Sequence, residues 1–326
     1  MVKIKKSLFL FLRISISILL LAALFKFNKI DLQALVSDIK EVDKFFLTVG
    51  FIVFFAGYLL GFLRWKMLLN AAGINILLKK LISSYSGGVF FNIFLPSTIG
   101  GDLVRTVDLA GHTKKAKEVI ATVFLDRLSG YIGLVLVVLF ALFFGWNLVL
   151  DKVVLSSISV IIILLILVLL VLFNNVMYSK ITEFLSTPGA GKIKESIKNM
   201  HQEIHIFRQR KKTIITNLLI SFIIQLLGPA SVYFIGLSLG IKISFIYYLI
   251  FLPIIGAITL LPVAIGGLGL REGLFVLYFA KAGVIKQSAL AMSLLSFSFA
   301  VFCAAIGGLI YVLTVYRRRI QSDQSS

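Results

Sequence analysis

The sequence is short of charged residues, and of acidic residues in particular. Only 14% of its 326 residues are charged, whereas 59% are hydrophobic and the mean hydropathy is +1.03. Soluble domains carry about 25% charged residues, so this composition excludes a soluble globular protein and indicates an integral membrane protein. The 33 Lys and Arg outnumber the 14 Asp and Glu, as expected where basic residues border an anionic membrane surface. We therefore expect no nucleic-acid partner.

Patterns for disulfides, metals and nucleotides are also missing. A single cysteine, Cys303, excludes an intrachain disulfide and a cysteine metal cluster. His201 and His205 have the spacing of a zinc pair, but Gln202 stands where a zinc protease needs Glu. No nucleotide-binding loop follows the pattern of glycines and lysine that phosphates require. We expect no cofactor, no metal site and no catalytic residues.

Hydrophobic runs are what the chain has instead. A helix needs about 20 apolar residues to cross a bilayer, and six stretches meet this length: 7–27, 45–63, 119–145, 153–173, 213–239 and 288–316. Two further apolar regions, 79–118 and 243–286, are interrupted by Pro and paired Gly. We interpret them as re-entrant helical hairpins, with short full crossings as the alternative. The predicted fold is an all-α polytopic membrane protein with about eight membrane segments.

Basic residues predict the orientation of these segments, because they mark the cytoplasmic side. The clusters lie at 3–6, 64–80, 105–117, 180–212 and 317–319. All of them share one side only if region 79–118 enters and leaves the membrane there, which places both termini in the cytoplasm of a plasma-membrane protein. Segment 174–212 has apolar residues three and four apart and is predicted to be a basic amphipathic cytoplasmic linker.

The two interrupted regions contain an internal repeat. Residues 95–105 and 261–271 share Leu, Pro, Ile, Gly, Gly and Arg at an offset of 166 residues without a gap, and the same offset superimposes the neighbouring spans. Residues 45–145 and 213–316 are thus predicted to be two inverted repeats of span, hairpin and span within one membrane domain, 1–326. Many secondary transporters use inverted repeats with broken helices that form a site near the membrane midplane.

The interruptions and one charged pair supply the candidate site. A helix that restarts after a break directs backbone donors and its positive dipole end at the gap, and a nearby Arg suits phosphate. Alternatively, the glycines only shape a bend, and each Arg pairs with a neighbouring acid or reaches the headgroups. Asp126 and Arg127 interrupt an apolar span at a cost of about 3 kcal/mol per charge. They either line a pathway or couple transport to protons, or they form a structural ion pair between helices. The predicted substrate-binding residues are Gly100, Gly101, Asp102, Arg105, Asp126, Arg127, Gly266, Gly267, Arg271 and Glu272.

Arg64 stands apart from this set. Arg64, Trp65 and Lys66 follow the end of span 45–63. Basic and aromatic residues at a span end are typical of interfacial anchoring. We therefore interpret Arg64 as an anchor at the membrane surface.

With these motifs, the sequence resembles the lysylphosphatidylglycerol synthase transmembrane-region family of flippase-like proteins. The resemblance is carried by residues 92–96, 100–105, 126–130 and 266–273. It implies a polytopic domain that, in bacterial multiple-peptide-resistance proteins, is fused to an aminoacyl-transferase domain and moves the aminoacylated lipid to the outer leaflet. The last predicted span ends ten residues before Ser326, so we expect a stand-alone member without that enzyme domain.

These features favour one function over two alternatives. The first hypothesis is a translocase that moves an anionic, aminoacylated or polyprenyl-phosphate-linked lipid between leaflets through a midplane cavity. The alternatives are an integral membrane lipid-modifying transferase and a non-transporting partner subunit of a lipid synthase. The expected partners are a membrane phospholipid or lipid-linked substrate and, as a second candidate, a separate lipid-modifying enzyme.

Overall fold

The described part of the chain is helical. The computed structural model describes residues 15–27, 30–94, 100–113, 115–145, 151–173, 210–260 and 264–324. An apolar helix, Ser15–Phe27, comes first. The elements that follow are α2 (Leu32–Lys40), α3 (Lys44–Ala71), α4 (Leu78–Phe94), α5 (Gly100–Thr113), α6 (Ala116–Gly145), α7 (Lys152–Phe173), α10 (Lys211–Ser238), α11 (Phe245–Thr259), the short 3₁₀ helix η2 (Ile265–Gly267), α12 (Leu270–Lys281) and α13 (Lys286–Gln324).

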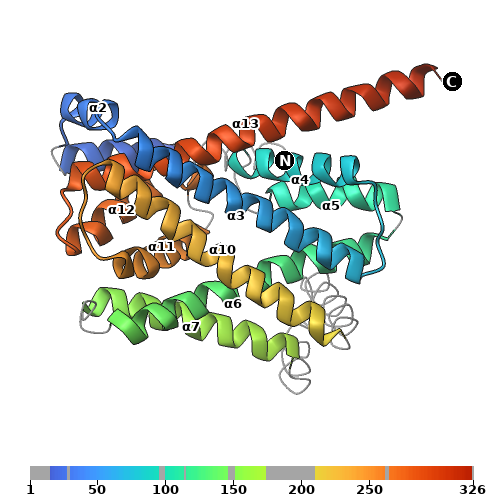
Figure 1. Ribbon diagram of the computed structural model, residues 1–326, viewed down its shortest axis with the longest axis horizontal. Helices are drawn as coiled ribbons and strands as arrows, with labels where there is room; N and C mark the ends of the chain where they lie inside the picture. Colours follow the sequence, from blue (N-terminus) through green and yellow to red (C-terminus); the bar gives the residue numbers. More distant parts are fainter. Residues whose placement is uncertain are drawn as a thin grey trace.

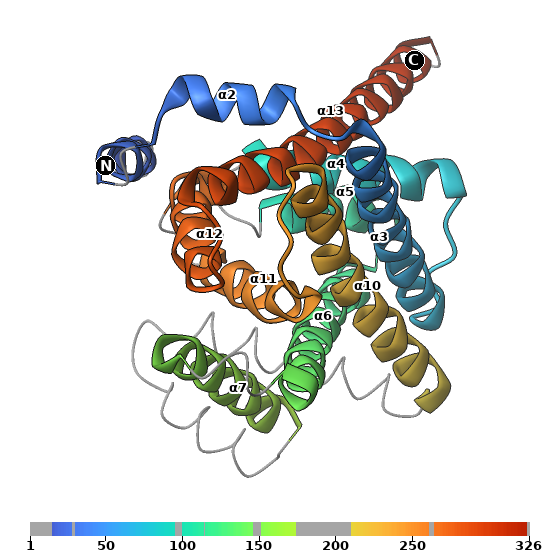
Figure 2. The ribbon, with the colours of Figure 1, turned by 60° about the vertical axis from the view of Figure 1, so that its left-hand side comes forward.

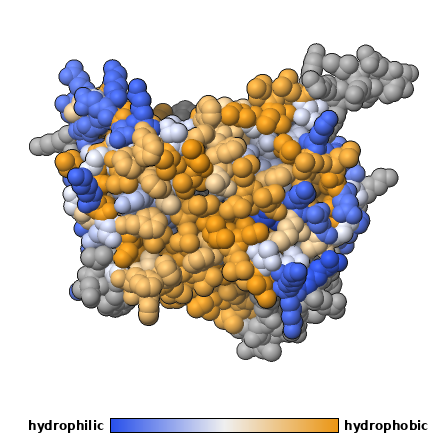
Figure 3. Space-filling view, in the orientation of Figure 1, coloured by the Kyte–Doolittle hydropathy of each residue, from blue (hydrophilic) through white to orange (hydrophobic). Residues whose placement is uncertain are grey.

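Within the described residues, five helices are long and apolar enough to cross a membrane: α3, α6, α7, α10 and α13. They confirm five of the six predicted spans. The sixth, 7–27, is described only from residue 15, so that crossing stays a prediction. Hydrophobic side chains form a broad band between two hydrophilic ends of the molecule (Figure 3). The protein is therefore a multi-pass membrane protein.

Helices α3 and α10 form a central antiparallel pair (Figure 1). Asp43 caps α3 by accepting a hydrogen bond from the Phe45 amide at 2.8 Å, and its own amide donates to the Ser238 carbonyl at the end of α10 at 2.9 Å. About two turns earlier in α10, the Ser231 hydroxyl donates to the Gly50 carbonyl at 2.8 Å. Both contacts supply hydrogen bonds to backbone groups that lipid hydrocarbon cannot provide. They therefore fix how the two helices align.

The two interrupted regions each form a pair of short helices. Helix α4 packs on α5, and α11 packs on α12. At 1.5 Å per residue, α5 extends about 21 Å, less than the roughly 30 Å hydrocarbon core. Each pair also lies against a long helix from the other half of the chain, because α4 packs on α13 and α11 packs on α6 (Figures 1 and 2). The interruptions with Pro96 and Pro262 lie outside the described residues.

Gly101 brings α4 and α5 into close contact. A Cβ built on Gly101 would lie 1.9 Å from the Gly88 carbonyl oxygen, so neither helix could keep its position. The Gly101 amide donates to Asn92 Oδ1 of α4 at 3.1 Å. Gly101 therefore allows the close approach of two backbones that small residues give in membrane helices.

This contact gives a stability prediction. Gly101→Ala is expected to lower the free energy of unfolding by about 1–3 kcal/mol, because the added methyl group overpacks the helix contact. Gly111→Ala is the matched control on the same helix, since a Cβ there meets nothing within 4 Å. Thermal denaturation of both variants in detergent, followed by size-exclusion chromatography, measures the difference. Equal stability of the two variants would contradict this interpretation.

Candidate functional site

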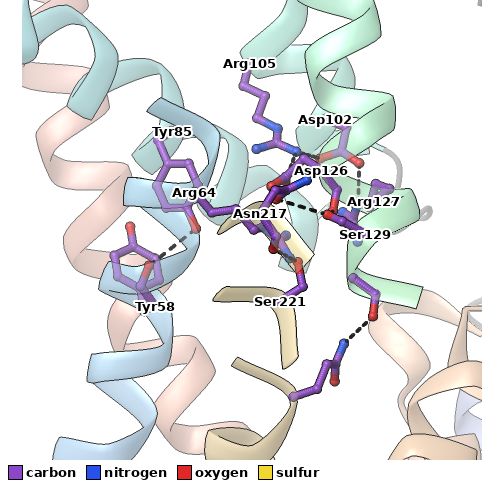
Figure 4. A network of polar contacts seen from close by, with 12 residues as sticks. Tyr58, Arg64, Tyr85, Asp102, Arg105, Asp126, Arg127, Ser129, Asn217 and Ser221 are labelled. Carbon is purple, nitrogen blue, oxygen red and sulfur yellow. Dashed lines mark hydrogen bonds and ion pairs between the residues drawn. The ribbon is translucent and has the colours of Figure 1, made fainter. Parts of the chain in front are cut away.

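A carboxylate on α6 is held between arginines from two other helices. Asp126 Oδ1 accepts a hydrogen bond from Arg64 Nε of α3 at 2.8 Å, and its Oδ2 accepts one from Arg105 of α5 at 3.0 Å (Figure 4). All three side chains are buried. Charge-assisted hydrogen bonds of this length are among the strongest available to a protein, and they offset the cost of holding ions away from water.

A second carboxylate extends this arrangement. Asp102 Oδ1 lies 3.0 Å from the same Arg105 guanidinium, and Asp102 Oδ2 accepts a hydrogen bond from Arg127 Nε at 2.6 Å. We call Arg64, Asp102, Arg105, Asp126 and Arg127 the ion-pair network. Three arginines and two aspartates give the network one net positive charge.

Helix α10 joins the network from the second half of the chain. Arg64 donates to the Ser221 hydroxyl at 2.8 Å, and Gln225 Nε2 donates to the Gly130 carbonyl at 3.0 Å. The Ser129 hydroxyl donates to Asn217 Oδ1 at 3.3 Å. The network therefore connects α3, α5 and α6 with α10 (Figure 4).

The corresponding region of the second half has a different charge pattern. Arg271 pairs with its neighbour Glu272, whose other oxygen accepts a hydrogen bond from the Gly269 amide at 2.6 Å. The fully buried Glu272 thus caps α12. At the offset of the repeat, Asp126 and Arg127 correspond to the neutral Met292 and Ser293. The ion-pair network has no such counterpart in the described residues of the second half.

The glycines before α12 serve the turn. Gly266, Gly267 and Gly269 have φ values of 58°, 73° and 82°. In this left-handed region a side chain is strained, whereas glycine is not. A Cβ on Gly266 would lie 3.4 Å from the Ile93 carbonyl oxygen, so the restart of α12 lies close to the end of α4.

The charged side chains border two cavities. A cavity of about 470 Å³ between α3, α6, α10, α11 and α13 is lined by Arg64, Asp126, Arg127 and Arg271, and a smaller pocket of about 190 Å³ beside α4 is lined by Asp102, Arg105 and Asn92. The structure thus brings five predicted site residues to these cavities: Asp102, Arg105, Asp126, Arg127 and Arg271. The other five, which line neither cavity, are Gly100, Gly101, Gly266, Gly267 and Glu272.

The interpretation of Arg64 as a surface anchor was wrong. Its side chain is only 11% exposed and contacts Asp126 and Ser221. The signal that could have identified it is the apolar run Met67-Leu68-Leu69 after it, which extends α3 to Ala71 and places Arg64 two turns inside the helix. Ser221, Asn217 and Gln225 were also missed, because isolated polar residues of this kind are common in membrane helices.

No metal site accompanies these charges in the described part of the chain, where no three His, Cys, Asp or Glu side chains are arranged to hold an ion. Fold and site together define a multi-pass helical membrane protein with a largely buried ion-pair network in its first half, joined by hydrogen bonds to α10 of the second half. The chain belongs to the lysylphosphatidylglycerol synthase TM region family, which matches residues 10–308.

Two relatives share most of this length. The chain is 25% identical over 276 residues to the UPF0104 membrane protein PH1989 of Pyrococcus horikoshii, covering 78% of this chain and 82% of the relative. It is also 25% identical over 271 residues to a UPF0104 membrane protein of Methanothermobacter thermautotrophicus, covering 76% and 78%. No solved structure matches the chain.

Proposed function

We propose that this protein is a lipid translocase that moves an anionic, aminoacylated or polyprenyl-phosphate-linked lipid between leaflets. The observation that carries the proposal is the cavity of about 470 Å³ bordered by Arg64, Asp126, Arg127 and Arg271 between long apolar helices. Ionisable residues within membrane helices face cavities or pathways for polar substrates far more often than they face lipid. A cavity of this size falls within the range of small-molecule binding sites.

The charges favour an anionic headgroup. The network carries one net positive charge, and Arg271 adds a guanidinium whose charge is balanced by Glu272. In the described structure, Nε of Arg271 is buried without a hydrogen-bond partner. An unsatisfied buried donor is costly, and a phosphate oxygen would satisfy it. Guanidinium groups suit phosphate because they present several donors in one plane.

The transport mechanism we propose uses two inverted repeats with re-entrant hairpins. The antiparallel arrangement of α3 and α10 supports it (Figure 1). So does the packing of each short-helix pair on a long helix of the other half, α4 on α13 and α11 on α6. We further propose that the start of α6 and the end of α3 face the cytoplasm of the cell, together with both termini, because basic residues gather there. The basic linker 174–212, of which residues 174–209 lie outside the described residues, would be the docking point for a separate lipid-modifying enzyme.

Reconstitution tests transport directly. Liposomes with fluorescent phosphatidylglycerol are treated with a membrane-impermeant quencher, and the loss of protected signal gives the rate of headgroup translocation. We expect the wild-type protein to exceed protein-free liposomes, and Arg271→Gln to be at least tenfold slower than wild type, because its headgroup contact is lost. Lys286→Gln, a matched loss of one positive charge at the exposed start of α13, is expected to resemble wild type.

Three outcomes would contradict the proposal. If wild-type protein moves lipid no faster than protein-free liposomes do, the translocase is excluded and the non-transporting partner subunit is favoured. Equal rates for Arg271→Gln and wild type would remove the arginine from the mechanism. Covalent change of the lipid, detected by mass spectrometry after the assay, would indicate the lipid-modifying transferase instead.

A further inference from the structure

The polar cavity adjoins a larger apolar crevice. A space of about 630 Å³ lies between α6, α7 and the end of α11. Four residues line both spaces: Arg127, Tyr131, Leu134 and Leu260. Apart from Arg127, the crevice is lined by apolar residues, Tyr131 and two serines. Both serines donate to the Val153 carbonyl of their own helix, at 3.0 Å for Ser156 and 2.7 Å for Ser157.

Helix α7 forms one wall of this crevice and belongs to neither predicted repeat. It packs only weakly on the bundle, through α6 and α11 (Figure 2). Its start is fixed to α12 by two contacts, from Lys281 Nζ to Asp151 Oδ2 at 2.7 Å and between Ser157 and Tyr278 hydroxyls at 2.9 Å. The hydrogen bond from Lys281 lowers the pKa of the Asp151 carboxyl and so favours its charged form. The start of α7 is thus held to α12, and Arg127 lies near the opposite end of the crevice lining, one turn from Phe124.

The dimensions of the crevice match a hydrocarbon chain. Its lining runs from residue 124 to 135 on α6 and from 156 to 168 on α7. At 1.5 Å per residue this is about 17 Å, close to the roughly 15 Å that one leaflet contributes to the hydrocarbon core. An apolar crevice of this length with a guanidinium near one end is complementary to a lipid, which has an apolar chain and an anionic head.

We propose that the crevice between α6, α7 and α11 binds one hydrocarbon chain of an anionic membrane lipid, with the phosphate of that lipid at Arg127. This site would let the headgroup enter the polar cavity while the chain stays in an apolar environment. The proposal rests on the proposed function for the fate of the bound lipid, but binding itself can be measured without transport. In this proposal, α7 contacts one side of the bound hydrocarbon chain.

Two adjacent residues of α7 give a matched test. Leu164 lines the crevice, whereas Ile163 does not, and their exposed fractions are nearly equal at 56% and 55%. Leu164→Trp is expected to fill the crevice, while Ile163→Trp places the same side chain toward lipid. Each protein is reconstituted in nanodiscs of phosphatidylglycerol and phosphatidylethanolamine and extracted into detergent. Native mass spectrometry then counts the lipids that remain bound.

We expect wild type and Ile163→Trp to retain one phosphatidylglycerol, and Leu164→Trp to lose at least 80% of it. Arg127→Gln is expected to remove the preference for phosphatidylglycerol over phosphatidylethanolamine. Retention by Leu164→Trp, loss from Ile163→Trp or absence of a retained lipid in wild type would overturn the crevice site. If lipid binding follows the expected pattern but neither wild type nor any variant moves lipid in liposomes, the crevice site is supported and the proposed function is contradicted.

Discussion

Asp126→Leu is expected to lower the free energy of unfolding by about 3–5 kcal/mol, the range for removing one partner of a buried ion pair. The substitution removes both the negative charge and the two acceptor oxygens of the side chain. Arg64 would keep its hydrogen bond to Ser221, and Arg105 would keep its ion pair with Asp102 and its position over the Trp65 ring. We also expect headgroup translocation at the protein-free rate, because Asp126 lines the polar cavity.

Reversible unfolding in mixed micelles of SDS and a mild detergent measures this loss. Glu118→Gln is the control, since it removes an acid from the first turn of the same helix and is expected to change stability by less than about 0.5 kcal/mol. Asp126→Asn keeps an oxygen acceptor and should lie between wild type and Asp126→Leu. A fully stable Asp126→Leu protein would show that the ion pairs add nothing to the fold.

Arg64→Met has the second largest expected effect, a loss of about 3 kcal/mol, because it leaves the Asp126 carboxylate with Arg105 alone. If Arg64 and Asp126 act as a pair, Arg64→Met with Asp126→Leu should destabilise by less than the sum of the single variants. Contacting residues in one network show coupling of about 0.5–3 kcal/mol. The double-mutant cycle is measured in the same unfolding assay.

The matched cycle pairs Arg64→Met with Glu118→Gln, an acid outside the ion-pair network. Those two changes should add within about 0.5 kcal/mol. Strict additivity of Arg64→Met and Asp126→Leu would contradict a direct interaction between the two side chains. It would then assign the destabilisation to each residue separately.

The long helices could be predicted because hydropathy and length are properties of single segments. The predicted spans 119–145 and 213–239 agree with α6 and α10 to within three residues at each end. The end of α3 was placed eight residues early, at Leu63 instead of Ala71. Arg64 and Lys66 interrupt the apolar run there, although the helix continues through them. Because of this error, Arg64 was placed at the membrane surface and left out of the predicted site.

The candidate site could be predicted only as a set of residue types. Asp126 and Arg127 were identified because charges in an apolar run are costly, and a structural ion pair between helices was one of the two roles considered. Each of them does pair with a residue of another helix. Arg64 and Ser221 are 157 residues apart in sequence, and no local pattern connects them. The need for glycine at position 101 also depends on a second helix. Gly101 approaches Gly88 closely only when α4 packs on α5.

The surplus of one arginine in the network has a consequence for the membrane as a barrier. A hydrated cavity between helices is a potential leak for protons and sodium, which would dissipate the gradients that a cell maintains. A positively charged constriction repels small cations, as it does in pores that exclude protons. Arg64, Arg105 and Arg127 outnumber Asp102 and Asp126 where the two cavities meet. The same charges that attract an anionic headgroup would therefore limit the leak of protons and sodium through the protein.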